Sequence, residues 1–246
     1  MYTFKRRIKD FLKTRFPRAT RMYHHFTNTL KSCVELPPRL FVDETNIEIL
    51  AHNWATYGLV SSSRFLRNER RFYYEEDIIS HFKKMMREGG VFFDIGAHIG
   101  YWSILAAHRG AKKVVAFEPI YGLTRVLARA KREYGLPIEI VSRPVGEEGK
   151  EVALDNPHAA AGRETAVSVD EFVRRTGIVP TAMKIDVDGN EPAIIRGAME
   201  TLRAHRPDLF FEIREETAYL LSDLNALGYR EVKRFGSDNI FVILSG

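Results

Sequence analysis

The pattern of hydrophobic and polar positions along the chain changes at Val91. From there onward, short apolar runs of strand length alternate with stretches of helical length. The apolar runs lie at 91–95, 113–118, 138–142, 183–187 and 208–213, and the helical stretches at 100–109, 121–134, 168–176, 191–204 and 215–227. This alternation predicts an α/β fold in which a mostly parallel sheet is covered by helices on both faces.

The last part of the chain has the pattern of a hairpin. Two strand-like runs, REVKRF at 230–235 and NIFVIL at 239–244, are separated by Gly236, Ser237 and Asp238. Glycine beside small polar residues favours a tight turn between antiparallel strands. The pattern therefore predicts one antiparallel strand in the sheet, unlike the all-parallel order typical of dinucleotide dehydrogenases.

Residues 1–90 lack the alternation and are basic. They contain 17 Lys and Arg against 10 Asp and Glu, whereas residues 91–246 contain 20 against 22. Apolar residues recur at helical spacing between Phe4 and Phe16, which predicts a basic amphipathic helix. This helix either packs its apolar face on the main domain, the more common arrangement, or contacts anionic lipid or a partner. We therefore expect a basic, mainly helical extension at 1–90 and a nucleotide-binding domain at 91–246.

Composition argues against several classes of protein. A chain with 45% hydrophobic and 28% charged residues is typical of soluble globular proteins. No run approaches the ~18 to 20 apolar residues of a membrane-spanning helix, and no apolar run of signal-peptide length follows the basic start. The single cysteine, Cys33, excludes an internal disulfide and a cysteine cluster for zinc. We expect a cytoplasmic protein, with peripheral membrane contact through the N-terminal helix as an alternative.

A nucleotide-binding turn is predicted in VFFDIGAHIGYWS (91–103), where the first strand of the sheet meets its helix. Glycine lets the backbone turn sharply beside a ligand, and the start of the helix offers unpaired N–H groups. The residues expected to contact a cofactor here are Asp94, Gly96, Ala97, His98 and Gly100. The alternative is a tight turn that binds nothing.

The next strand ends in Glu118 and Pro119, both expected at the cofactor. A carboxylate at this strand tip is placed to accept both hydroxyls of a ribose, which argues against an empty turn. The dinucleotide fingerprint, however, requires glycine where His98 and Tyr101 stand. A cofactor with ribose and adenine but no diphosphate therefore fits better, and S-adenosylmethionine is such a cofactor.

A second polar cluster lies in MKIDVDGNEPAIIRGA (183–198). Lys184, Asp186 and Asp188 alternate with apolar residues, so in a strand they point to one face. Near the carboxyl end of the strand they would line the crevice where open α/β sheets bind ligands. The plain alternative is a solvated strand end with one capping carboxylate. Asp186, Asp188 and Glu191 could also bind Mg²⁺ or Ca²⁺, but no histidine adjoins them and no metal is expected.

Together these segments resemble the FkbM-type family of S-adenosylmethionine-dependent methyltransferases. The residues that carry the resemblance are FFDIGAHIG (92–100), VVAFEP (114–119), MKIDVDGNE (183–191), GAMETL (197–202), RPDLFFEI (206–213) and LGY (227–229). The resemblance implies a class I methyltransferase fold, a Rossmann-like seven-stranded sheet whose last strand is antiparallel. It also implies that S-adenosylmethionine lies over the first loop, with its ribose on Glu118.

The resemblance further implies the acceptor and the adenine contact. The family typically methylates an oxygen of a natural product, sugar or glycan, so we expect a small-molecule or saccharide acceptor. Similar proteins end their third strand in an Asn-Ala pair, whereas this chain has Arg143 and Pro144, and its KIDVDG replaces the common KIDVEG. Ser142 and Arg143 are the residues expected near the adenine.

Methyl transfer to a hydroxyl is helped by a general base. Asp186 and Asp188 are the expected bases, with Glu212 at the tip of the fifth strand as a third. Lys184 is expected to hold a neighbouring carboxylate ionised or to contact an anionic group of the acceptor. His98 and His158 could line the site, although a single histidine is more often a satisfied polar residue.

Two other functions stay open. The basic N-terminal region would suit a nucleic-acid methyltransferase, but the chain lacks the Asn/Asp-Pro-Pro-aromatic element that amino-group methylation of bases commonly uses. No stable nucleic-acid partner is therefore expected. The third possibility is a binding protein that retains the fold without catalysis, against which the intact Asp94, Glu118 and 184–191 cluster argue.

Overall fold

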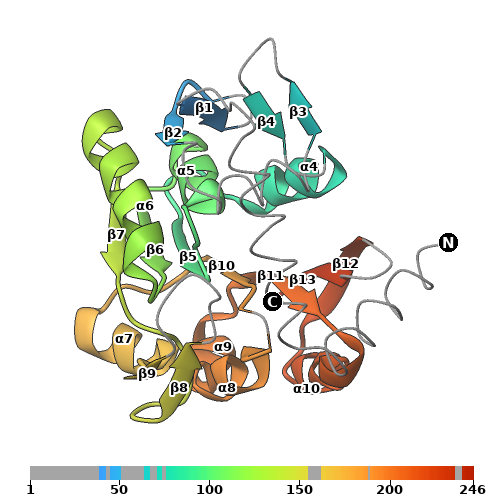
Figure 1. Cartoon of the computed structure of the whole chain (residues 1–246). Coiled ribbons are helices and arrows are strands. Elements are labelled where there is room, and N and C mark those ends of the chain that lie inside the picture. The colour runs from blue at the N-terminus through green and yellow to red at the C-terminus, as the bar shows by residue number, and fades with distance from the viewer. Residues whose placement is uncertain are drawn as a thin grey trace, which may run out of the picture.

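A seven-stranded sheet forms the centre of the protein in the computed structural model, which describes residues 39–42, 45–50, 64–66, 71–73, 76–154, 162–187, 189–235 and 240–246 (Figure 1). The strands are β5 (Val91–Ile95), β6 (Lys113–Phe117), β7 (Ile138–Val141), β10 (Ala182–Ile185), β11 (Asp208–Ile213), β12 (Arg230–Phe235) and β13 (Ile240–Ser245). Their order is β12-β13-β11-β10-β5-β6-β7. β13 pairs antiparallel with β11 and β12, and all other pairs are parallel. The predicted α/β class and the antiparallel hairpin strand are confirmed.

The chain reverses its direction of travel across the sheet next to β5. It runs from β5 outward through β6 to β7, and then resumes on the other side of β5 with β10 and β11. β5 and β10 pair in parallel, with Asp94 opposite Lys184. The crevice beside such a reversal is where open α/β sheets bind their ligands.

Helices cover both faces of the sheet because its central strands are apolar on both sides. Phe92, Ala116 and Phe210 pack against the helices α4 (Glu76–Met85), α5 (Tyr101–His108) and α6 (Tyr121–Tyr134). Phe93 and Met183 face the opposite layer. That layer consists of α7 (Val169–Thr176), α8 (Glu191–Arg196), α9 (Met199–His205) and α10 (Leu220–Ala226), with the 3₁₀ turn η2 at Glu215–Thr217. None of the described helices is long and apolar enough to cross a membrane.

Two helices predicted as single elements are divided. The stretch 191–204 forms α8 and α9, because the chain breaks at Gly197. The Gly197 carbonyl oxygen accepts a hydrogen bond from the Asp170 N–H at 2.9 Å, and the Thr201 N–H donates to Asp170 Oδ1 at 2.8 Å, so the helical bond between Gly197 and Thr201 is not made. The stretch 215–227 likewise begins as η2 and continues as α10.

Two small sheets were not predicted. A hairpin of β8 (Glu151–Leu154) and β9 (Gly162–Thr165) follows β7. A four-stranded sheet of order β2-β1-β4-β3 packs against α5 and α6; its strands are β1 (Arg39–Val42), β2 (Glu48–Leu50), β3 (Arg64–Leu66) and β4 (Arg71–Tyr73). The expectation of a mainly helical region therefore does not hold for the four strands between residues 39 and 73. The predicted basic helix at 4–16 lies outside the described residues, and the division of the chain at residue 90 stays a prediction.

Candidate functional site

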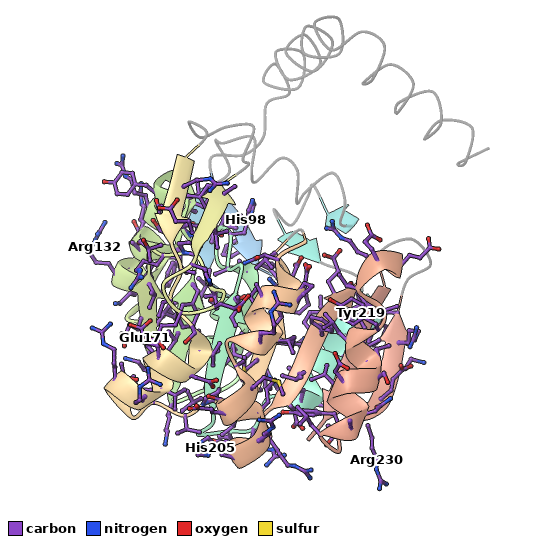
Figure 2. All side chains as sticks on the ribbon, turned by 90° about the horizontal axis from the view of Figure 1, so that it is seen from below. His98, Arg132, Glu171, His205, Tyr219 and Arg230 are labelled. Carbon is purple, nitrogen blue, oxygen red and sulfur yellow. The ribbon has the colours of Figure 1, made fainter. Side chains whose placement is uncertain are left out.

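The predicted site residues that the structure describes lie at or next to the carboxyl edge of the central sheet. Because β5, β6, β10 and β11 are parallel, the residues that follow them meet at one edge. Figure 2 shows His98, just after β5, on the side of the molecule opposite His205 and Arg230, which lie at the amino ends of β11 and β12. The hairpin of β8 and β9 lies on the same side as His98.

The turn between β5 and α5 has a shape that requires its two glycines. Gly96 has a φ of 78°, His98 of 55° and Gly100 of 90°, all in the left-handed region that side chains with a Cβ disfavour. A Cβ at Gly96 would overlap the carbonyl oxygen of Asp186, and one at Gly100 would overlap the side chain of Leu127. The turn thus lies directly against the segment after β10, as a shared ligand site requires.

Glu118 is held in place by the backbone of this turn. Its Oε2 accepts a hydrogen bond from the His98 N–H at 2.9 Å, and its Oε1 accepts one from the Ile120 N–H at 2.9 Å. Burial raises the pKa of Glu118 above its ordinary 4.5, although both hydrogen bonds lower it. Each carboxylate oxygen can accept more than one hydrogen bond. The group is therefore oriented and still able to accept two hydroxyls.

Lys184 connects the two predicted clusters. Its Nζ lies 3.5 Å from Asp94 Oδ1 and 3.2 Å from Asp186 Oδ2, and it donates to the Gly96 carbonyl oxygen at 2.9 Å. Asp94 is completely buried, and its Oδ2 accepts a hydrogen bond from Ser103 Oγ at 2.6 Å. Burial raises the pKa of Asp94 above its ordinary 3.8, against the opposing effect of Lys184.

The charges at this edge distinguish between possible cofactors. In their ionised forms Asp94, Glu118 and Asp186 carry three negative charges around the single positive charge of Lys184. Such a site suits a cofactor that carries positive charge, as S-adenosylmethionine does on its sulfur and its ammonium group. Asp94 Oδ1 is buried beside Lys184 Nζ, so this negative charge lies directly behind the turn. The residues present therefore fit S-adenosylmethionine.

The other expected residues occupy different environments. β10 ends at Ile185, two residues earlier than predicted, so Asp186 lies in the loop that follows. Glu212 is buried in β11, with its Oε2 3.4 Å from Arg214. Asp188 and His158 lie outside the described residues.

The residues expected at the adenine lie after β7. Ser142 is exposed. The guanidinium of Arg143 donates to the carbonyl oxygens of Thr165 at 3.0 Å and Ala166 at 3.2 Å, so it connects the end of β9 to the segment that follows β7. Pro119 is partly buried beside Glu118. Their contact with adenine stays a prediction.

For two polar residues of the site, the sequence did not predict the role that the structure indicates. Ser103 is a buried hydroxyl in the apolar helix YWSILAAH, and this isolated polar residue one turn after the loop is the signal that could have identified it. Glu191, considered only as a possible cation ligand, is buried at the start of α8. Among the described residues, no group of three or more His, Cys, Asp or Glu side chains is arranged to hold a metal ion.

A comparison with known protein families supports the resemblance that the sequence motifs indicate. The sequence model of the methyltransferase FkbM domain matches residues 94–231, more than half of the chain. None of the curated proteins compared with the chain matches it.

One solved methyltransferase shares the fold. A methyltransferase FkbM from Methylobacillus flagellatus KT is similar with 20% identity and a TM-score of 0.51, over 63% of this chain and 43% of that chain. The present chain thus corresponds to less than half of that protein. A precorrin-6y C5,15-methyltransferase from Geobacter metallireducens GS-15 has 12% identity and a TM-score of 0.49, over 71% and 89% of the two chains.

Proposed function

The chain belongs to the FkbM methyltransferase family, and we propose that it methylates a hydroxyl oxygen of a small molecule, sugar or glycan with S-adenosylmethionine as its cofactor. The observation that carries this proposal is the position of Lys184. Its Nζ contacts Asp94, the Gly96 carbonyl oxygen and Asp186, next to β5, where the chain changes its direction across the sheet. Lys184 thus links the turn after β5, which fits the cofactor, to Asp186, whose carboxylate can accept a proton from the acceptor.

The cofactor would be held by the turn after β5 and by Glu118. Glu118 would accept the ribose hydroxyls, and the loop backbone would face the charged amino-acid part, while the buried Asp94 holds Lys184 in place behind the loop. When bound, S-adenosylmethionine supplies a methyl group on a positively charged sulfur, which departs as a neutral thioether. The fixed conformation of the turn means that little ordering is needed when the ligand binds.

Asp186 is the base that we assign to the acceptor. Its side chain is 31% exposed, whereas Asp94 is fully buried and the Glu212 side chain is 4% exposed. Among the predicted bases that the structure describes, Asp186 is therefore the one that an acceptor can reach. It would take the proton of the acceptor hydroxyl while its ion pair with Lys184 holds it in position.

A small acceptor is supported over nucleic acid by the charge of the domain. Residues 91–246 carry 20 basic against 22 acidic side chains, whereas binding to a phosphate backbone depends on a basic surface. The hairpin of β8 and β9, on the same side of the molecule as His98 (Figure 2), is the element that we assign to acceptor recognition.

The proposal is tested by transfer of tritiated methyl from S-adenosylmethionine to fractionated metabolites, glycans and nucleic acids of the host. We expect label in a metabolite or glycan fraction, as an ether that survives mild alkali. Label confined to nucleic acid, or released by alkali as a methyl ester, would contradict O-methylation of a hydroxyl.

Replacing the proposed base sharpens this test. Asp186→Asn is expected to lower kcat by about 100-fold or more, the usual contribution of a general base, while the Kd for S-adenosylhomocysteine changes less than about threefold. Asp223→Asn, at an exposed acid in α10, is the matched control and should leave both unchanged. A loss of cofactor affinity alone in Asp186→Asn would reassign the residue to cofactor binding.

A further inference from the structure

Glu191 is a buried carboxylate whose two oxygens have different surroundings. It is the first residue of α8 and only 1% exposed. Its Oε1 accepts hydrogen bonds from the backbone N–H groups of Gly189 at 3.1 Å and Val187 at 3.4 Å. Its Oε2 is buried and has no hydrogen-bond partner among the residues that the structure describes.

Burial of this carboxylate carries a desolvation cost. A carboxylate removed from water with one oxygen unpaired loses hydration that is only partly replaced. An uncharged side chain could accept the same N–H groups at a smaller desolvation cost. Local features that oppose stability without compensation nearby are most often found where function requires them.

The backbone that Glu191 holds is the loop between β10 and α8, which carries Asp186. Gly189 in this loop has a φ of 110°, a conformation that other residues rarely adopt. Asn190 fixes the end of the loop by donating from Nδ2 to the Val145 carbonyl oxygen at 2.8 Å. At the start of the loop, the Asp186 carbonyl oxygen occupies the space that a Cβ on Gly96 would need. The described residues of the loop are therefore held by contacts with the cofactor turn, with Glu191 and with Val145 in the segment after β7.

We propose that Glu191 is a positioning residue, which fixes the backbone at Val187 and Gly189 so that the Asp186 carboxylate meets Lys184 and the acceptor. It acts through its hydrogen-bond acceptor at Oε1, and it neither exchanges a proton with the acceptor nor binds a cation. The inference rests on the proposed function for its effect on turnover, whereas its effect on the loop is independent of any acceptor.

The effect on the loop is tested by amide hydrogen exchange in the free protein. Glu191→Ala is expected to accelerate exchange at Val187 and Gly189 by about tenfold or more, since a charge-assisted hydrogen bond is lost at each N–H. Glu191→Gln keeps an acceptor oxygen at the same place and should restore most of the protection. Glu200→Ala, at an exposed acid in the first turn of α9, is the control and should change neither amide. Unchanged exchange in Glu191→Ala would overturn the proposal.

The effect on turnover separates positioning from chemistry. With the acceptor fraction labelled by the wild type, Glu191→Ala should lower kcat by about tenfold or more, with the Kd for S-adenosylhomocysteine within about threefold of the wild type. Glu191→Gln should recover most of this loss, because it retains the acceptor oxygen. If Glu191→Gln is as inactive as Glu191→Ala, the charge itself is required and the positioning role is wrong. If the wild type labels no fraction, the proposed function fails, and the exchange measurement still decides whether Glu191 holds the loop.

Discussion

At the scale of single residues, two carboxylates of the site are held in contrasting ways. Glu118 is fixed by two backbone N–H groups, whereas Asp94 is fixed by the side chains of Ser103 and Lys184. Both are buried, and burial raises the pKa of each above its ordinary value. Such perturbed groups cluster at functional sites because binding and catalysis use buried charge.

Replacement of Glu118 tests its assignment to the ribose. Glu118→Ala is expected to weaken binding of S-adenosylhomocysteine by more than about tenfold, because two hydroxyls lose a charged acceptor. Calorimetric titration measures the change directly, with Glu216→Ala, at an exposed acid of η2, as the control. An unchanged Kd in Glu118→Ala would show that the ribose is bound elsewhere.

The affinity for the cofactor product should also depend on pH. Because the pKa of Glu118 is raised above 4.5, the folded protein takes up this proton at a higher pH than an exposed glutamate would. Protonation removes the charge that accepts the ribose hydroxyls, so the Kd for S-adenosylhomocysteine should begin to rise while the pH is still above 4.5. Titrations from about pH 8 down to about pH 4.5 measure this rise. A Kd that stays constant over the interval would contradict it.

The sequence identifies residues better than it identifies their partners. The motifs place Lys184, Asp186 and Glu118 at strand ends, and local spacing is sufficient for that. The contact between Lys184 and Asp94 joins strands that are distant in sequence, and the bond from Ser103 depends on the rotation of α5. Arg143 was expected at the adenine from its position after the third strand, and only the structure shows its guanidinium on Thr165 and Ala166.

At the scale of elements, the turn between β5 and α5 was predictable because its determinants are local. The strand β5 and the helix α6 have the predicted bounds, since their apolar periodicity is uninterrupted. The division between α8 and α9 was not predictable, because it depends on hydrogen bonds that Asp170, on α7, makes with Gly197 and Thr201. The hairpin of β8 and β9 was missed because its strands are short and partly exposed.

Substitution of glycine in this turn tests whether its shape matters. Gly96→Ala places a Cβ against the Asp186 carbonyl oxygen at a φ of 78°, so we expect a loss of stability of about 1–3 kcal/mol and weaker binding of S-adenosylhomocysteine. Gly122→Ala is the matched control in α6, where a Cβ meets no atom within 4 Å. It should be neutral or stabilise the protein by up to about 1 kcal/mol. Thermal unfolding and calorimetry measure both effects, and equal behaviour of the two variants would contradict the account of the turn.

At the scale of the whole molecule, the order of the seven strands determines that the proposed site lies beside β5 and β10. The alternation of strands and helices predicts a parallel sheet with one antiparallel strand, and the structure confirms it. The small sheet of β1 to β4 was missed because strands of three or four residues carry little periodicity, and because β1 pairs in parallel with β4, far along the chain. Pairing between strands that are distant in sequence cannot be detected from the hydrophobic periodicity of either strand alone.

The most direct test of the central claim, that the carboxyl edge beside β5 and β10 binds S-adenosylmethionine, is a calorimetric titration of the wild-type protein. We predict saturable binding of S-adenosylmethionine and S-adenosylhomocysteine at one site per chain, and no measurable binding of NAD. Folded protein that binds neither S-adenosyl compound, or that binds NAD instead, would contradict the claim.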